Sequence, residues 1–127
     1  MNPFVLNDET IPTIAKNISD LLINYLKCTI VNTVVFSYGF HGRRREVFQR
    51  ILSEISRVEY DFIPFLLWCS EEENINRMKF DNRSDAHIQR TLNESRKALD
   101  DVNYPKLDIT NLSVPEVVKT IITKARL

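Results

Sequence analysis

Hydrophobic residues recur every three or four positions in several stretches of this chain, a spacing that predicts amphipathic helices. The first stretch predicts a helix over about residues 9–27, with Asp8 available to cap it and Pro12 tolerated in its first turn. A second helix is predicted over 43–56. The apolar positions are Ile14, Ile18, Leu21, Leu22, Tyr25 and Leu26 in the first helix and Val47, Phe48, Ile51, Leu52 and Ile55 in the second.

Three further helices are predicted in the second half of the chain by residues that favour helix starts. Ser70, followed by acidic residues, starts a short helix, and Ser84 or Asp85 starts another that runs to about residue 100. The sequence SVPE at 113–116 fits a capping box, in which serine and glutamate each satisfy a backbone N–H of the other. The last helix then continues to the end of the chain.

Three apolar stretches rich in β-branched and aromatic residues predict strands near 30–37, 60–69 and 105–109. The second is almost wholly apolar, as expected for a strand covered on both faces, although Pro64 removes one ladder donor. The order α, β, α, β, α, α, β, α predicts a parallel α/β sheet in three α/β/α layers. The whole chain, 127 residues, is expected to form a single α/β domain.

Composition narrows the classes of function. The chain has 17 basic and 17 acidic residues, so no overall field draws it to nucleic acid or to anionic membranes. Its longest apolar run, FIPFLLWC, is far shorter than the roughly 20 residues that cross a bilayer, and no signal sequence is evident. Cys28 and Cys69 are far apart in apolar stretches, which favours buried thiols and a cytoplasmic location.

The segment SYGFHGRRR, residues 37–45, combines both glycines of the chain with three consecutive arginines after a predicted strand. It is not a P-loop, because that motif requires G-x-x-x-x-G-K-S/T. The N-terminus of the following helix and the guanidinium groups of Arg43 to Arg45 could bind an anionic group. A solvated turn with exposed basic residues explains the same pattern equally well.

A second basic group lies in NRMKFDNRS, where Arg77 and Arg83 flank a predicted break and Arg90 follows in the next helix. Arginines on a mobile segment suit phosphoryl transfer, which depends on charge stabilisation. The alternative is a charged surface hairpin paired with the acids at 71–73, and composition favours it. The two histidines have no metal-ligand spacing, so no side-chain metal site is expected.

The order strand, basic glycine loop, helix, apolar strand ending WCSEEENINRM, arginine-bearing break and final LDITNLSVPEVV resembles small P-loop kinases. The likeness is to the shikimate, gluconate and adenylate kinase-like group, and it runs from about residue 9 to the end. The resemblance implies an ATP-dependent phosphotransferase that uses ATP and Mg²⁺ on a small-molecule acceptor. It implies that Arg77 and Arg83 contact the nucleotide, with a lid-like segment at about 77–87. It also implies that the acceptor loop comprises Tyr38, Gly39, His41 and Arg43.

The sequence departs from the family because it has no first strand, P-loop or following helix. It resembles the C-terminal two thirds of such a domain, and we expect it to be inactive alone. The family's sheet order places the first strand between the third and fourth, so its loss is expected to open the sheet. The alternative is a non-catalytic interaction module that binds a partner chain, or a second copy, through an open strand edge or the apolar face of the first helix.

Overall fold

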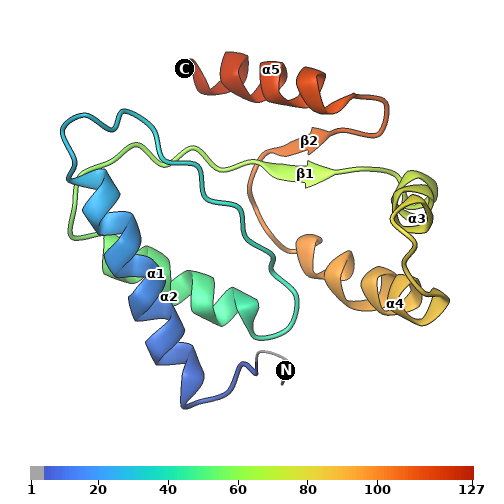
Figure 1. The fold of residues 1–127 in the computed structure, drawn as a ribbon, viewed down its shortest axis with the longest axis horizontal. Coiled ribbons are helices and arrows are strands. Elements are labelled where there is room, and N and C mark those ends of the chain that lie inside the picture. The colour runs from blue at the N-terminus through green and yellow to red at the C-terminus, as the bar shows by residue number, and fades with distance from the viewer. Residues whose placement is uncertain (1–4) are drawn as a thin grey trace. The chain divides into compact units, whose positions relative to one another are not determined.

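The computed structural model describes residues 5–127, which divide into two compact units, one up to Asp61 and the other from Phe62 onward. Figure 1 traces the elements of both units. No helix within residues 5–127 is both long and apolar enough to cross a membrane.

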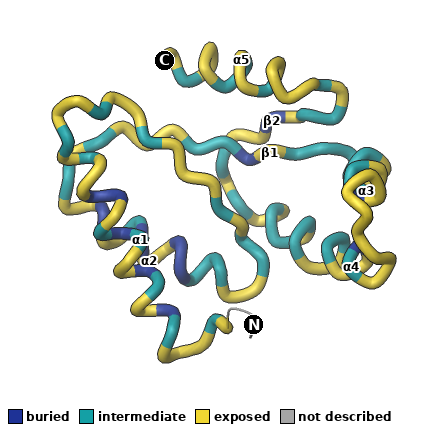
Figure 2. Tube along the Cα trace, in the orientation of Figure 1, coloured by how far each residue is buried: buried dark blue, intermediate teal, exposed yellow. Residues whose placement is uncertain are grey.

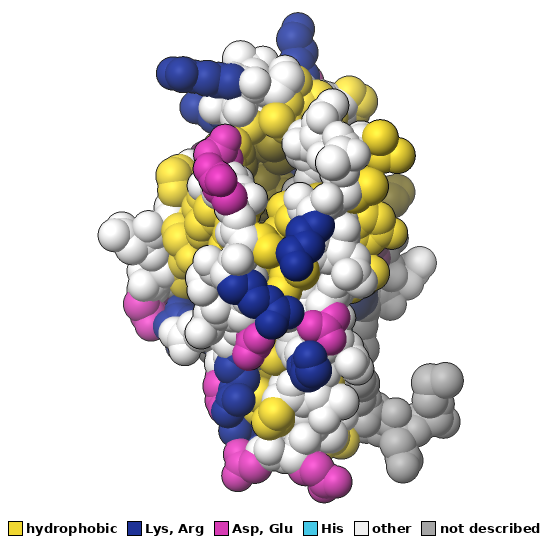
Figure 3. Space-filling view, turned by 90° about the vertical axis from the view of Figure 1, so that its left-hand side faces the viewer, with side chains coloured by type: hydrophobic (Ala, Val, Ile, Leu, Met, Phe, Trp, Pro, Cys, Tyr) yellow, Lys and Arg dark blue, Asp and Glu magenta, His cyan; other side chains and the backbone are white. Residues whose placement is uncertain are grey.

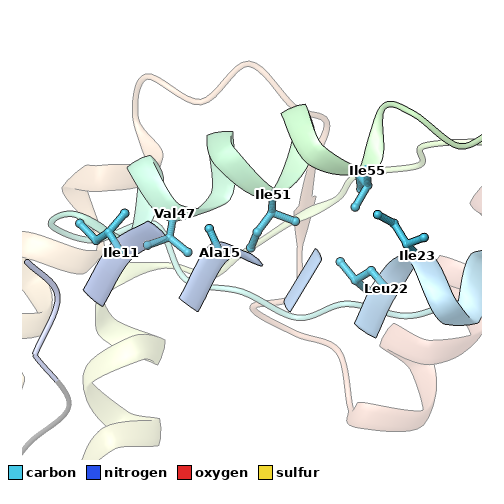
Figure 4. Close-up of a cluster of buried hydrophobic side chains, with 7 residues drawn as sticks. All are labelled: Ile11, Ala15, Leu22, Ile23, Val47, Ile51 and Ile55. Carbon is cyan, nitrogen blue, oxygen red and sulfur yellow. The ribbon is translucent and has the colours of Figure 1, made fainter. Parts of the chain in front are cut away.

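The first unit is a pair of helices, α1 (Thr10–Leu26) and α2 (Arg44–Ile55), that pack against each other. Their facing side chains form one core, and Figure 4 shows the α1 side chains pointing toward those of α2. Ser19 is also buried, and its hydroxyl donates to the carbonyl of Ala15 at 2.6 Å, so no polar group is left unpaired there. The core cluster consists of Ile11, Ala15, Leu22, Ile23, Val47, Ile51 and Ile55.

The buried face agrees with the prediction in α2 and differs from it in α1. The α2 face is confirmed, with Leu52 partly buried at its edge. In α1 the buried face is rotated relative to the prediction, so Leu21 and Tyr25 are exposed while Ala15 and Ser19 are buried. Ala15 and Ser19 are small, so they let the backbone of α2 approach α1 closely. Because neither residue is strongly hydrophobic, the hydrophobicity pattern did not place them on the buried face.

The start of α1 also differs from the prediction. The side chain of Asn7, not Asp8, satisfies the first backbone N–H groups, accepting from Glu9 at 2.9 Å and from Thr10 at 2.8 Å. Asp8 instead accepts a hydrogen bond from Arg43 at 2.6 Å. Asparagine and aspartate are equally good caps, so their order in the sequence could not decide between them.

The strand predicted at 30–37 is wrong: residues 31–40 form no regular secondary structure. The segment follows α1 and runs extended toward α2, with Val34 packed at the edge of the core and Val35 exposed. A strand exists only where a neighbouring strand pairs with its backbone, and β-propensity alone does not supply that neighbour.

The second unit contains a small sheet and five helical elements, three of them α-helices. Its two strands are parallel, with Leu66 opposite Lys106 and Trp68 opposite Asp108. The strands lie inside the predicted ranges 60–69 and 105–109 but are shorter, and the apolar residues up to Pro64 remain unpaired. The elements are β1 (Leu66–Trp68), α3 (Glu71–Phe80), α4 (Asp85–Arg90) with a π-helical turn (Thr91–Ser95) and a 3₁₀ turn (Lys97–Leu99), β2 (Lys106–Asp108) and α5 (Val114–Ala125).

The predicted helix starts of this unit are confirmed. Ser70 and Ser84 cap α3 and α4 through their side-chain oxygens, which accept from the N–H groups of Glu73 and His87. Ser113 and Glu116 form the capping box of α5, and the Ser113 N–H donates to Glu116 at 2.7 Å. This hydrogen bond lowers the pKa of Glu116 below its ordinary value.

Burial is uneven along the chain. Figure 2 shows the buried residues concentrated on α1 and α2, whereas α5 contains none. Exposed apolar side chains occur in both units, and Figure 3 shows hydrophobic side chains open to solvent beside charged ones. α2 covers one side of the first helix, while Leu21 and Tyr25 of its predicted apolar face stay exposed, so a partner surface on this helix remains a prediction.

Candidate functional site

The basic loop between residues 37 and 45 is shaped by one of its two glycines. Gly42 has φ +58°, in the left-handed region, and a Cβ placed there would contact nothing within 4 Å. Gly39 lacks this conformation, and its Cβ would meet the ring of His41 at an ordinary distance of 3.5 Å. Of the two glycines, only Gly42 has a backbone conformation that favours glycine over other residues.

Replacing Gly42 by alanine is expected to destabilise the first unit by about 1 kcal/mol, because the left-handed conformation strains any residue with a Cβ. Gly39→Ala is the matched control and is expected to be nearly neutral. Chemical denaturation of both variants followed by circular dichroism measures the difference. Equal midpoints for the two variants would show that the loop conformation does not depend on Gly42.

Aromatic rings line the approach to this loop. Tyr38 stacks on Phe36 at 5.5 Å and on Phe48 of α2 at 6.0 Å, and Phe40 meets Phe48 edge-on at 4.9 Å. Partial burial raises the pKa of Tyr38, and the nearby Arg44 guanidinium opposes this shift. Tyr38 therefore acts in packing, with its hydroxyl facing Arg44.

The arginines of the loop are engaged within the first unit. Arg43 donates to Asp8 at 2.6 Å and to Glu46 at 2.9 and 3.1 Å, and these hydrogen bonds raise the pKa of Arg43. Arg44 donates from Nε to the Nε2 atom of His41 at 3.2 Å. An anion at Arg43 must therefore displace two carboxylates, which favours the interpretation of this segment as a structured turn.

In the second unit, Arg77 joins α3 to the segment that follows β2. Its Nε donates to Glu73 at 2.8 Å, and its terminal nitrogen donates to the carbonyl of Ile109 at 2.9 Å and lies 3.5 Å from that of Thr110. The N–H of Ser70 also donates to the Thr110 hydroxyl at 2.9 Å. Arg77 therefore holds the carboxyl end of β2 next to α3.

Arg83 belongs to a cationic cluster that also contains His87 and Arg90. Asn82, at φ 57°, ends α3, and Arg83 donates its backbone N–H to the carbonyl of Met78 in the closing turn. Its guanidinium lies 3.3 Å from Nε2 of His87, and the guanidinium of Arg90 lies 3.3 Å from Nδ1 of the same ring. Among residues 5–127 neither arginine forms an ion pair.

This cluster has unused hydrogen-bond donors. An imidazole offers at most one acceptor nitrogen, so His87 can satisfy only one of the two guanidinium groups that face it. Sequence reasoning paired Arg83 with Arg77 and left His87 out. His87 and Arg90 lie three residues apart on α4, a spacing that places them on one face, and Arg83 directly precedes the Ser84 cap of that helix. This spacing could have indicated the cluster.

A shallow cavity of about 440 Å³ lies on α3, lined by Glu73, Asn76, Arg77, Phe80 and Asp81. The ring of Phe80 is 88% exposed, so it offers an uncovered aromatic surface at this cavity. The residues predicted for the acceptor loop, Tyr38 to Arg43, belong to the first unit.

No family model, curated protein or solved structure matches this chain. Within residues 5–127 no group of three or more His, Cys, Asp or Glu side chains is arranged to hold a metal ion. The interpretation of the site therefore depends on its own geometry.

Proposed function

We propose that this chain is an ATP-dependent small-molecule kinase-like domain that lacks the P-loop, and that Arg83 contacts the nucleotide phosphates when a P-loop is supplied. The observation that carries the proposal is the cluster of Arg83, His87 and Arg90, whose guanidinium groups have no carboxylate partner among the described residues. Guanidinium groups bind phosphate through paired hydrogen bonds, and such contacts stabilise charge in phosphoryl transfer.

Two further features support this proposal. Arg77, which the resemblance places beside the adenine, lines the cavity on α3 together with the exposed ring of Phe80. The strands near 60–69 and 105–109 pair directly and in parallel, while the segment 30–37 has no strand partner in the described chain. In the family the first strand lies between the third and fourth strands. A chain without that strand is expected to form an incomplete sheet of this kind.

The proposed domain is inactive alone, because the sequence has no P-loop lysine or backbone cradle. ATP and Mg²⁺ are the proposed cofactors, and the P-loop of the complete domain would supply the chief phosphate contacts. Tyr38, Gly39, His41 and Arg43 remain the proposed acceptor loop. Both cysteines are free thiols, in keeping with the proposed cytoplasmic location.

Calorimetric titration of Mg-ATP tests this proposal. The chain is compared with a version carrying an N-terminal strand, P-loop and helix taken from a shikimate kinase-like protein. We expect binding only in the extended version, and an affinity about tenfold lower after Arg83→Ala. Lys119→Ala removes an exposed charge on α5 and is the matched control. An extended protein that folds without binding ATP, or equal effects of the two variants, would refute the proposal.

A non-catalytic interaction module is the second candidate, and α5 favours it. Val114, Val118 and Ile122 lie four residues apart on this helix and are all exposed. Such a stripe is typical of a helix that buries its apolar face against another chain. Nucleotide binding separates the two candidates, because this module does not require it.

A further inference from the structure

The two-stranded sheet has an open edge at β1. The N–H of Leu66 donates to Pro105 and the carbonyl of Trp68 accepts from Ile109, so both residues face β2. Backbone groups of successive residues point to opposite sides of a strand, and the N–H and carbonyl of Leu67 therefore point away from β2. The Leu67 side chain is 47% exposed. No other strand in residues 5–127 pairs with this edge.

The same chain contains an extended segment that lacks a strand partner. The backbone N–H groups of residues 32–40 donate to no backbone carbonyl within the described chain. The segment is rich in β-branched residues, and the side chain of Val35 is 88% exposed. An extended, apolar segment with unpaired backbone groups is a ready partner for an open strand edge.

We propose that two copies of this chain form a dimer by exchanging these segments. Residues 31–37 of one copy add to the β1 edge of the second copy as a parallel strand, and the second copy returns the same contact. The exchange uses both unpaired surfaces of each copy, and in the proposed dimer two chains satisfy these surfaces reciprocally.

Charge complementarity selects the parallel direction. The second copy is the occupant because residues 31–37 pair with no strand within the described chain. Residues 31–37 lead into the arginine loop, where Arg44 has no carboxylate partner among the described residues. β1 leads into α3, where Glu71 and Glu72 are exposed and form no ion pair in the described chain. A parallel arrangement brings these opposite charges to the same end of the paired strands, and an antiparallel one separates them.

The dimer does not depend on the proposed nucleotide binding. Its first test is light scattering coupled to size-exclusion chromatography over a range of concentrations, with hydrogen exchange of the backbone amides. We expect a concentration-dependent dimer in which alternate amides within residues 32–36, that of Val35 among them, become protected. A monomer at all concentrations, or a dimer with these amides unprotected, would refute the exchange.

Two proline variants test the two halves of the contact. Leu67→Pro removes an N–H that β2 does not use, and Val35→Pro changes an exposed residue whose N–H is unpaired. Each is expected to weaken dimerisation by about tenfold or more. Leu67→Thr and Val35→Thr keep the N–H groups and are the matched controls, with dimerisation close to that of the parent chain.

A mixture of the two proline variants distinguishes exchange from other dimers. Each variant alone retains no intact contact, whereas a mixed pair retains one, between the edge of one chain and the segment of the other. We therefore expect a heterodimer in the mixture and monomers in the separate samples. If one proline variant dimerises as the parent does, the proposal is wrong. Circular dichroism confirms that each variant is folded.

The charge argument has its own test. Replacing Glu71 and Glu72 together by lysine is expected to weaken the dimer about tenfold and to reduce its sensitivity to salt. The control pair is Glu54→Lys with Glu59→Lys, which makes the same change of charge away from α3. Equal dimerisation of the two double variants would refute the parallel arrangement.

Discussion

Ile51→Ala is expected to lower the free energy of unfolding of the first unit by about 2 to 5 kcal/mol. Ile51 is fully buried and sits in the middle of the α1–α2 core. Alanine removes apolar surface from the core and leaves a cavity that the rigid helix pair can fill only in part. Because this core has few members, the loss is a large share of the unit's stability.

Leu21→Ala is the control for Ile51. Leu21 lies on α1 and is 55% exposed, so its truncation is expected to cost less than about 1 kcal/mol. Hydrogen exchange of the amides in α1 and α2 reports on this unit separately from the second one. Similar exchange rates in the two variants would mean that the α1–α2 contact does not stabilise the unit.

Arg77→Ala is expected to lower the stability of the second unit by about 2 kcal/mol. The guanidinium contacts a carboxylate on α3 and two carbonyls after β2, and its loss leaves those acceptors without their donor. Arg77→Lys is expected to recover only part of this stability, because one ammonium group cannot reproduce the planar fork.

Trp68, the single tryptophan, lies in β1 and reports unfolding of this unit by fluorescence in urea. Arg83→Ala is the control, since the guanidinium of Arg83 contacts only His87 in the described chain. We expect its midpoint to equal that of the parent chain. An unchanged midpoint for Arg77→Ala would show that Arg77 has no structural role and is free to bind a ligand.

For Arg77 and Arg83, the sequence predicted the candidate residues but not their contacts. The motif NRMKFDNRS marked both residues as candidates, but their spacing did not reveal that the guanidinium of Arg77 is bonded to carbonyls of a segment 32 residues away. Conversely, His87 was set aside as having no metal-ligand spacing, although it lies between Arg83 and Arg90. Contacts between side chains depend on the fold, and residue type does not specify them.

The basic glycine loop shows the same limit. The sequence excluded a P-loop there and left an anion site and a structured turn as alternatives. Asp8, expected to cap the first helix, contacts Arg43 across the first unit instead. Only the folded chain brings that carboxylate to the loop, and it competes there with any anion.

The sequence by itself determined the helices. Helical periodicity and the serine caps at Ser70 and Ser113 are local, since a cap needs only neighbouring backbone groups, and α2 buries the face that its pattern predicts. Only the tertiary structure decided which apolar segments become strands. Leu66–Trp68 pairs with Lys106–Asp108, whereas residues 30–37 pair with no strand in the described part of the chain. A strand is stabilised by hydrogen bonds to a distant segment, so its own residues cannot establish that it forms.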